Sequence, residues 1–209
     1  MGKKLLLIGG GGHCHSVLDA VIDMKVYDEI GIIDSINSSY LGVSVIGNDD
    51  DIPALFEAGW TEAFITVGSV GDTKNRRRLF EMVKELGLSI PTIIDPTAII
   101  GQGVEIGEGV FVGKRVVINA GATASACAII NTGAVIEHDC EIGAFSHICP
   151  GTILCGQVKV GEDSHVGAGS VVKQLVEIGH NALIGAGSVV VKNIPDNSKA
   201  YGNPCRVVD

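Results

Sequence analysis

An apolar residue recurs every six residues over nearly the whole second half of this chain. Between Ile94 and Val190, one register of seventeen positions holds Ile, Val or Leu at every place except Ala124, which is also apolar. Glycine often follows the aliphatic residue, and a small residue or Val usually stands four places after it. A fixed period of six is too short for helical repeats and is typical of parallel β-helices, in which three hexads close one coil. We therefore predict a β-helix of about five to six coils, with the aliphatic residues pointing inward.

The first ninety residues show a different pattern, in which short apolar runs alternate with segments of helical periodicity. We predict strands over residues 4–8, 29–33, 43–46 and 63–67, and helices over residues 16–24, 50–58 and 72–86. This alternation predicts a small parallel sheet with helices on its faces. The expected organisation is α/β plus β-solenoid: a Rossmann-like domain over residues 1–90, then a β-helix domain with a C-terminal cap over residues 91–209.

A glycine run follows the first predicted strand at Gly9, Gly10, Gly11 and Gly12. Glycines before a helix allow the backbone N–H groups to approach an anionic ligand. The dinucleotide pattern GxGxxG is incomplete here, because Cys14 stands at its last glycine position. Asp34 lies about 20 residues further on, where an acid can bind a ribose hydroxyl. A nucleotide site is favoured over a plain tight turn, and NAD is less favoured than other nucleotides.

Charge and cysteine usage limit the partners and the compartment. The net charge of −9 argues against a nucleic-acid partner, since phosphate backbones attract basic surfaces. No apolar run is long enough to span a membrane, and the N-terminus lacks the features of a signal peptide. The six cysteines contain no CxxC pair and are interpreted as reduced thiols, which predicts a cytoplasmic protein.

Among the six histidines, His138 has the strongest functional signal because it stands between Glu137 and Asp139. Neighbouring carboxylates can orient an imidazole and stabilise its protonated form, as a general base requires. His147 and His165 differ by eighteen residues, one full coil, so we expect them in one column of one face. His147 follows His138 by nine residues, and we expect both to border one cleft. His165 and His180 are interpreted as solvated surface residues.

A metal hydratase site is an alternative interpretation of the histidines, since hexapeptide β-helices also carry zinc sites built from three histidines. Such sites use a His-x4-His pair, and this sequence contains none. We therefore expect no metal cofactor.

The glycine-rich start, the hexads, the segment from Asn131 to Cys140 and the tail Gly202-Asn203-Pro204 together resemble one family. It comprises the bacterial sugar O-/N-acetyltransferases of the sialic-acid and bacillosamine pathways of glycan biosynthesis. The sequence looks most like the enzymes that use acetyl-CoA to N-acetylate a UDP-4-amino-4,6-dideoxy sugar. The resemblance implies a left-handed β-helix, a homotrimer and CoA bound along a groove between neighbouring subunits.

The resemblance also implies site residues. His138 resembles the family's general base and Asp139 its acidic partner, while Asn131 resembles a residue lining the acceptor pocket. His147 resembles the second histidine near the acetyl thioester, and Gly156 falls where a backbone N–H faces the thioester carbonyl oxygen. Residues 9–13, from Gly9 to His13, resemble with Asp34 the nucleotide-sugar site.

Several alternatives remain open. Direct transfer with His138 as the base is favoured over an acetyl-cysteine intermediate on Cys140, Cys149 or Cys155. The alternative function is O-acetylation of sialic acid or another sugar hydroxyl. A zinc hydratase or a non-catalytic nucleotide-binding scaffold is less favoured.

Overall fold

The computed structural model describes residues 2–36 and 38–208, which divide into two compact units. The first unit comprises the chain up to Ser69 together with Lys74–Ile93. The second comprises Val70–Thr73 and the chain from Ile94 onward. None of the helices in the described part of the chain has the length and apolar character needed to cross a bilayer.

The first unit is built on a five-stranded sheet with the order β3-β4-β2-β1-β5. Its strands are β1 (Lys4–Ile8), β2 (Glu29–Ile33), β3 (Ser39–Tyr40), β4 (Val43–Gly47) and β5 (Glu62–Ile65). Strand β1 pairs in parallel with β2 and β5, while β3 and β4 form an antiparallel edge. The apolar run of β1 is fully buried, which explains why it lacks polar alternation.

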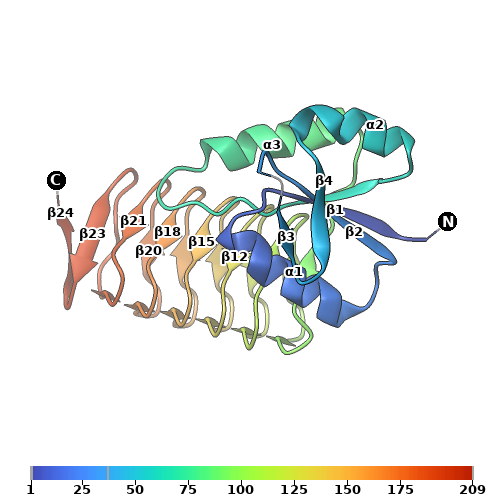
Figure 1. Cartoon of the computed structure of the whole chain (residues 1–209). Coiled ribbons are helices and arrows are strands. Elements are labelled where there is room, and N and C mark those ends of the chain that lie inside the picture. Colours follow the sequence, from blue (N-terminus) through green and yellow to red (C-terminus); the bar gives the residue numbers. More distant parts are fainter. Residues whose placement is uncertain (1, 37, 209) are drawn as a thin grey trace. The chain divides into compact units, whose positions relative to one another are not determined.

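Helices cover both faces of this sheet, with α1 on one side and α2 and α3 on the other (Figure 1). They are α1 (Gly12–Met24), α2 (Ile52–Glu57), which follows a 3-10 turn at Asp49–Asp51, and α3 (Lys74–Glu85). The predicted helices at 50–58 and 72–86 are confirmed with shorter bounds. The predicted start of α1 was wrong by four residues, because the last glycine of the run already forms its first turn.

The second unit is the predicted parallel β-helix. Its seventeen coil strands, β6–β22, are each two residues long and recur every six residues without an interrupting loop. The six-stranded face holds β7 (Ile99–Ile100), β10 (Val117–Ile118), β13 (Val135–Ile136), β16 (Ile153–Leu154), β19 (Val171–Val172) and β22 (Val189–Val190). The five-stranded face holds β8 (Glu105–Ile106), β11 (Thr123–Ala124), β14 (Glu141–Ile142), β17 (Lys159–Val160) and β20 (Glu177–Ile178). The eight-stranded face holds β6 (Ile93–Ile94), β9 (Phe111–Val112), β12 (Ile129–Ile130), β15 (His147–Ile148), β18 (His165–Val166), β21 (Leu183–Ile184) and the final strands β23 and β24.

The predicted inward register is confirmed by pairing and burial. From β6 to β19, each coil strand pairs with the strand eighteen residues later, as Ile118 does with Ile136 and Ile136 with Leu154. These aliphatic residues are at most 2 % exposed. Ile100 is 38 % exposed because it belongs to the first coil, where the stack of strands begins.

The β-helix ends in an antiparallel hairpin of β23 (Lys199–Gly202) and β24 (Cys205–Val208). The eighteen-residue spacing is lost here, since Leu183 pairs with Lys199, sixteen residues on. The predicted departure from the hexad register at Pro195 therefore agrees with the structure. The hairpin covers the hydrogen-bonding edge of β21, which would otherwise be open to pairing with another chain.

Candidate active site

The side chains of His138 and Asp139 form a hydrogen-bonded pair at one corner of the β-helix. They lie in the turn between β13 and β14, where the six-stranded face meets the five-stranded face. Nδ1 of His138 is 2.8 Å from Oδ2 of Asp139, and both side chains are more than half exposed. A carboxylate can only accept a hydrogen bond, so the proton lies on Nδ1. Nε2 then keeps its lone pair and is able to accept a proton.

Two glycines flank this pair in the neighbouring coils. A Cβ atom at Gly156, eighteen residues after His138, would lie 2.5 Å from Nε2 of that histidine. A Cβ atom at Gly121, eighteen residues before Asp139, would lie 2.6 Å from its Oδ1. Both glycines therefore leave the space that the two side chains occupy. Within the described residues, the N–H of Gly156 has no hydrogen-bond partner, so it is available to a bound ligand.

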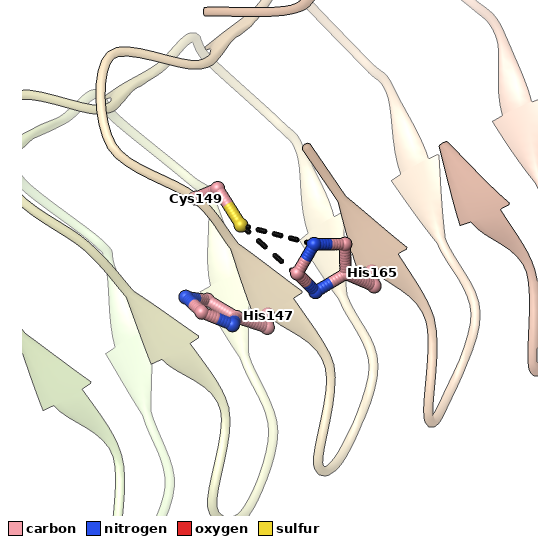
Figure 2. Close-up of side chains that lie close together, drawn as sticks. All are labelled: His147, Cys149 and His165. Carbon is pink, nitrogen blue, oxygen red and sulfur yellow. Dashed lines mark hydrogen bonds between the residues drawn. The ribbon is translucent and has the colours of Figure 1, made fainter. Parts of the chain in front are cut away.

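A second cluster lies at a different corner, where the eight-stranded face meets the six-stranded face (Figure 2). His147 and His165 occupy directly paired positions on β15 and β18, as their spacing predicts, and their ring centroids are 5.0 Å apart. Nε2 of His147 is 3.2 Å from Nδ2 of Asn131. Cys149 was not predicted to join these residues, yet its Sγ lies 3.3 Å from Nε2 of His165.

The predicted single cleft holding both His138 and His147 is not formed within one chain. The nine residues between them span one and a half sides of the triangular coil. His147 therefore lies on the eight-stranded face, opposite the corner that carries His138. Asn131 belongs to the His147 cluster, and Gly156 belongs to the His138 corner.

The environment of Cys140 and Cys149 disfavours an acetyl-cysteine intermediate on either residue. Burial raises the pKa of both Cys140 and Cys149 to about 11, so both thiols are protonated near neutral pH. The Cys140 thiol also donates a hydrogen bond to the carbonyl oxygen of Cys155. All six cysteines are free, in agreement with the expected reduced state.

The glycine run of the first unit is held by Asp34. Oδ2 of Asp34 accepts a hydrogen bond of 2.6 Å from the N–H of Gly10, and Oδ1 accepts one from Ile36. Backbone hydrogen bonds from Ile36 and Gly10 lower the pKa of this carboxyl group. Gly9 has φ +105° and a Cβ there would collide with Val67, so the turn itself requires this glycine.

A cavity of about 300 Å³ opens beside this turn and brings Gly9 and Asp34 together. Asn48, Asp49, Asn75 and Arg78 also line it. Arg78 was not predicted as a site residue, because its approach to Asp49 depends on the tertiary fold. Gly10, Gly11, Gly12 and His13 are not among the cavity's lining residues. Added Cβ atoms at Gly11 and Gly12 would meet nothing within 4 Å, which leaves room for a ligand at the start of α1.

A separate groove of about 440 Å³ lies on the five-stranded face, lined in part by Glu141, Lys159, Glu177 and His180. It contains none of the predicted site residues. The charged residues of its lining are mainly acidic, so its charge does not favour the phosphates of a nucleotide or of CoA.

Known families match both units of the chain. Residues 4–83 match the family described as PglD N-terminal domain. Residues 139–174 match the bacterial transferase hexapeptide repeats, and residues 157–192 match the hexapeptide repeat of succinyl-transferase. This combination, with an exposed histidine–carboxylate pair on the coil, defines the class as a hexapeptide-repeat acyltransferase.

Solved structures identify the family more narrowly. PerB from Caulobacter crescentus, whose structure contains CoA and GDP-perosamine, is 37 % identical with a TM-score of 0.93, and the match covers 99 % of this chain and 97 % of PerB. The acetyltransferase domain of PglB from Neisseria gonorrhoeae is 33 % identical with a TM-score of 0.93, covering 99 % of this chain and 100 % of that domain. The same domain has also been solved in complex with acetyl coenzyme A. The chain belongs to this family of sugar N-acetyltransferases, and its β-helix is the predicted left-handed one.

Proposed function

We propose that the protein transfers the acetyl group of acetyl-CoA to the amino group of a nucleotide-linked amino sugar. The observation that carries this proposal is the His138–Asp139 pair, in which Nε2 of His138 lies beside Gly156, a residue with an available N–H. The ligands of the relatives support it, since PerB was solved with CoA and GDP-perosamine and the PglB domain with acetyl coenzyme A.

In the proposed reaction, the amine nitrogen attacks the thioester carbonyl carbon while Nε2 of His138 takes a proton from that nitrogen. The new C–N bond forms, the C–S bond breaks, and sulfur leaves as the CoA thiolate, which then takes up a proton. Asp139 stabilises the imidazolium through Nδ1. General-base help of this kind contributes roughly 10²–10⁴-fold in rate. The Gly156 N–H donates to the developing oxyanion, and such a donor contributes about 3 kcal/mol.

The sugar nucleotide is assigned to the first unit, with Asp34 and the glycine run beside the 300 Å³ cavity. A nucleoside diphosphate can place its phosphates against the N-terminal turn of α1, where the helix dipole favours negative charge. UDP was expected from the sequence resemblance, whereas PerB was solved with a GDP sugar. The proposal therefore covers nucleoside-diphosphate amino sugars of either base. O-acetylation is the second candidate, because a hydroxyl acceptor can use the same base.

We further propose a homotrimer in the cytoplasm. A site that contains both His138 and His147 requires two copies of the chain, because one chain carries them on opposite sides of the coil. A closed three-fold ring makes three equivalent sites of this kind. The cytoplasm supplies acetyl-CoA and keeps the six free cysteines reduced.

The first test is thiol release from acetyl-CoA with UDP- and GDP-linked 4-amino sugars, and with free sialic acid, as acceptors. We expect turnover with a nucleotide amino sugar and at least a roughly 100-fold loss of kcat in His138→Ala, with KM for acetyl-CoA little changed. His180→Gln, which alters an exposed histidine elsewhere on the coil, is the control. Turnover with sialic acid alone would move the assignment to O-acetylation. Full activity of His138→Ala would reject His138 as the base.

A further inference from the structure

Two histidines and one cysteine converge on the eight-stranded face, and the proposed acetyl transfer uses only His147 among them. His147 and His165 are the first residues of paired strands, and their ring planes meet at 88° (Figure 2). Cys149 follows β15 at the position where eight of the seventeen hexads place a glycine. The potential ligand atoms of the three residues all lie within 4.8 Å of one another.

These distances are close to those of a tetrahedral metal site. Zinc–sulfur bonds of about 2.3 Å and zinc–nitrogen bonds of about 2.0–2.1 Å place neighbouring ligand atoms roughly 3.3–3.6 Å apart. The 3.3 Å between Sγ of Cys149 and Nε2 of His165 already meets this requirement. The other separations reach 4.8 Å at most, so the ring of His147 must move toward the other two ligand atoms to complete the set.

We propose that His147, Cys149 and His165 bind a divalent metal ion, and that zinc is the ion their chemistry fits best. Two imidazole nitrogens and one thiolate sulfur are the ligand types that zinc prefers, whereas magnesium and calcium require oxygen. On binding, a metal–sulfur bond forms and the cysteine proton leaves to solvent. Three protein ligands leave a fourth position for water.

The backbone holds the three residues in place before any ion arrives. The N–H groups of His147, Cys149 and His165 donate to the carbonyl oxygens of Ser164, Val166 and Ala182, at 2.8, 3.0 and 2.8 Å. A site on such a paired scaffold loses little conformational freedom on binding. Asn131 is the group that must give way, because its Nδ2 donates to Nε2 of His147. His147 therefore binds metal either through Nδ1 or after exchanging this partner.

The competing explanation is a buried thiol that merely donates a weak hydrogen bond to His165. Cys149 is only 5 % exposed, and buried cysteines commonly act as small apolar residues. The two explanations differ in one measurable respect: only a metal site creates a thiolate–metal bond.

Cobalt(II) titration of the full chain tests for that bond, because thiolate coordination gives a charge-transfer absorption in the near ultraviolet. We expect saturation at one ion per chain in the wild type, and no such band in Cys149→Ala. The matched control is Cys205→Ala, which removes a thiol of equal exposure, 5 %, in the C-terminal hairpin. This control should keep the band.

Zinc competition against a chromophoric chelator provides the second readout. Loss of a partner outside the coordination shell already costs roughly 10–100-fold in affinity, so we expect at least about 100-fold weaker binding in Cys149→Ala and His165→Gln. His180→Gln should bind as the wild type does. Cobalt binding without the thiolate band, or equal zinc affinity in the wild type and the two ligand variants, would overturn the proposal. Neither measurement uses substrate, so its outcome is independent of the acetyl-transfer assignment.

Discussion

Gly156 has no side chain, and this leaves room for the ring of His138. A methyl group there would occupy the place of the His138 ring, with 2.5 Å to Nε2 and 2.7 Å to Cε1. The ring is the far end of a side chain and can rotate away, whereas the surrounding backbone need not move. A substitution at Gly156 should therefore displace the base without disrupting the coil.

We predict that Gly156→Ala lowers kcat by about 10–100-fold, which is less than complete loss of a general base would cost. The Tm of this variant should stay close to that of the wild type. Gly187→Ala is the reciprocal control. Gly187 has φ +68° with open space around it, so an alanine there costs roughly 1–2 kcal/mol in backbone strain but contacts nothing. Steady-state kinetics and thermal unfolding of both variants check this. An inactive Gly187→Ala together with a fully active Gly156→Ala would contradict it.

At the residue scale, a role could be predicted from the sequence only where it follows the six-residue period. The inward aliphatic residues were predictable because burial itself is periodic. Cys149 was not placed beside His165, because it occupies an outward corner position about which apolar periodicity says nothing. The separation of His138 from His147 was not predicted. The nine residues between them span one and a half sides of the coil, so the two side chains lie on opposite sides of it.

At the scale of elements, the two-residue coil strands are stable only as a stack. Each contributes one inward residue to a core that extends through the coil, with Ile148 and Leu154 fully buried. The α1 helix shows the limit of sequence reasoning at this scale. Its first turn is made by Gly12, His13 and Cys14. The sequence predicted a loop here because of the glycine run, and it did not indicate that Cys14 is fully buried.

Adjacent residues of β16 provide a matched test of the inward register. Leu154 is fully buried, whereas Ile153 on the same strand points outward and is 37 % exposed. Leu154→Ala should destabilise the protein by about 2–5 kcal/mol, since it removes apolar contact and leaves a cavity. Ile153→Ala should cost less than about 1 kcal/mol in the isolated chain. Thermal and denaturant unfolding measure both, and equal losses would be inconsistent with this register.

At the scale of the whole molecule, the opposite placement of His138 and His147 makes the proposed assembly testable by complementation. His138→Ala and His147→Ala should each be inactive alone. When they are co-expressed and mixed at random in a trimer, about one site in four receives an intact His138 from one copy and an intact His147 from its neighbour. We predict about a quarter of wild-type activity for the mixture, measured by thiol release. No recovery in mixed trimers would mean that both histidines serve a site within one chain. An active His147→Ala variant would mean that His147 is dispensable.

The uninterrupted register also determines how a gene for such a protein can change in length. Duplicating fifty-four nucleotides, the codons for one eighteen-residue coil, beyond Lys173 would leave β23 and β24 on the same face as before. Duplicating eighteen nucleotides would move every later strand to the next face and carry the C-terminal hairpin with it. We expect the first kind of variant to fold and the second to fail, as judged by circular dichroism and unfolding. The length of such a protein can therefore change only in steps of one whole coil.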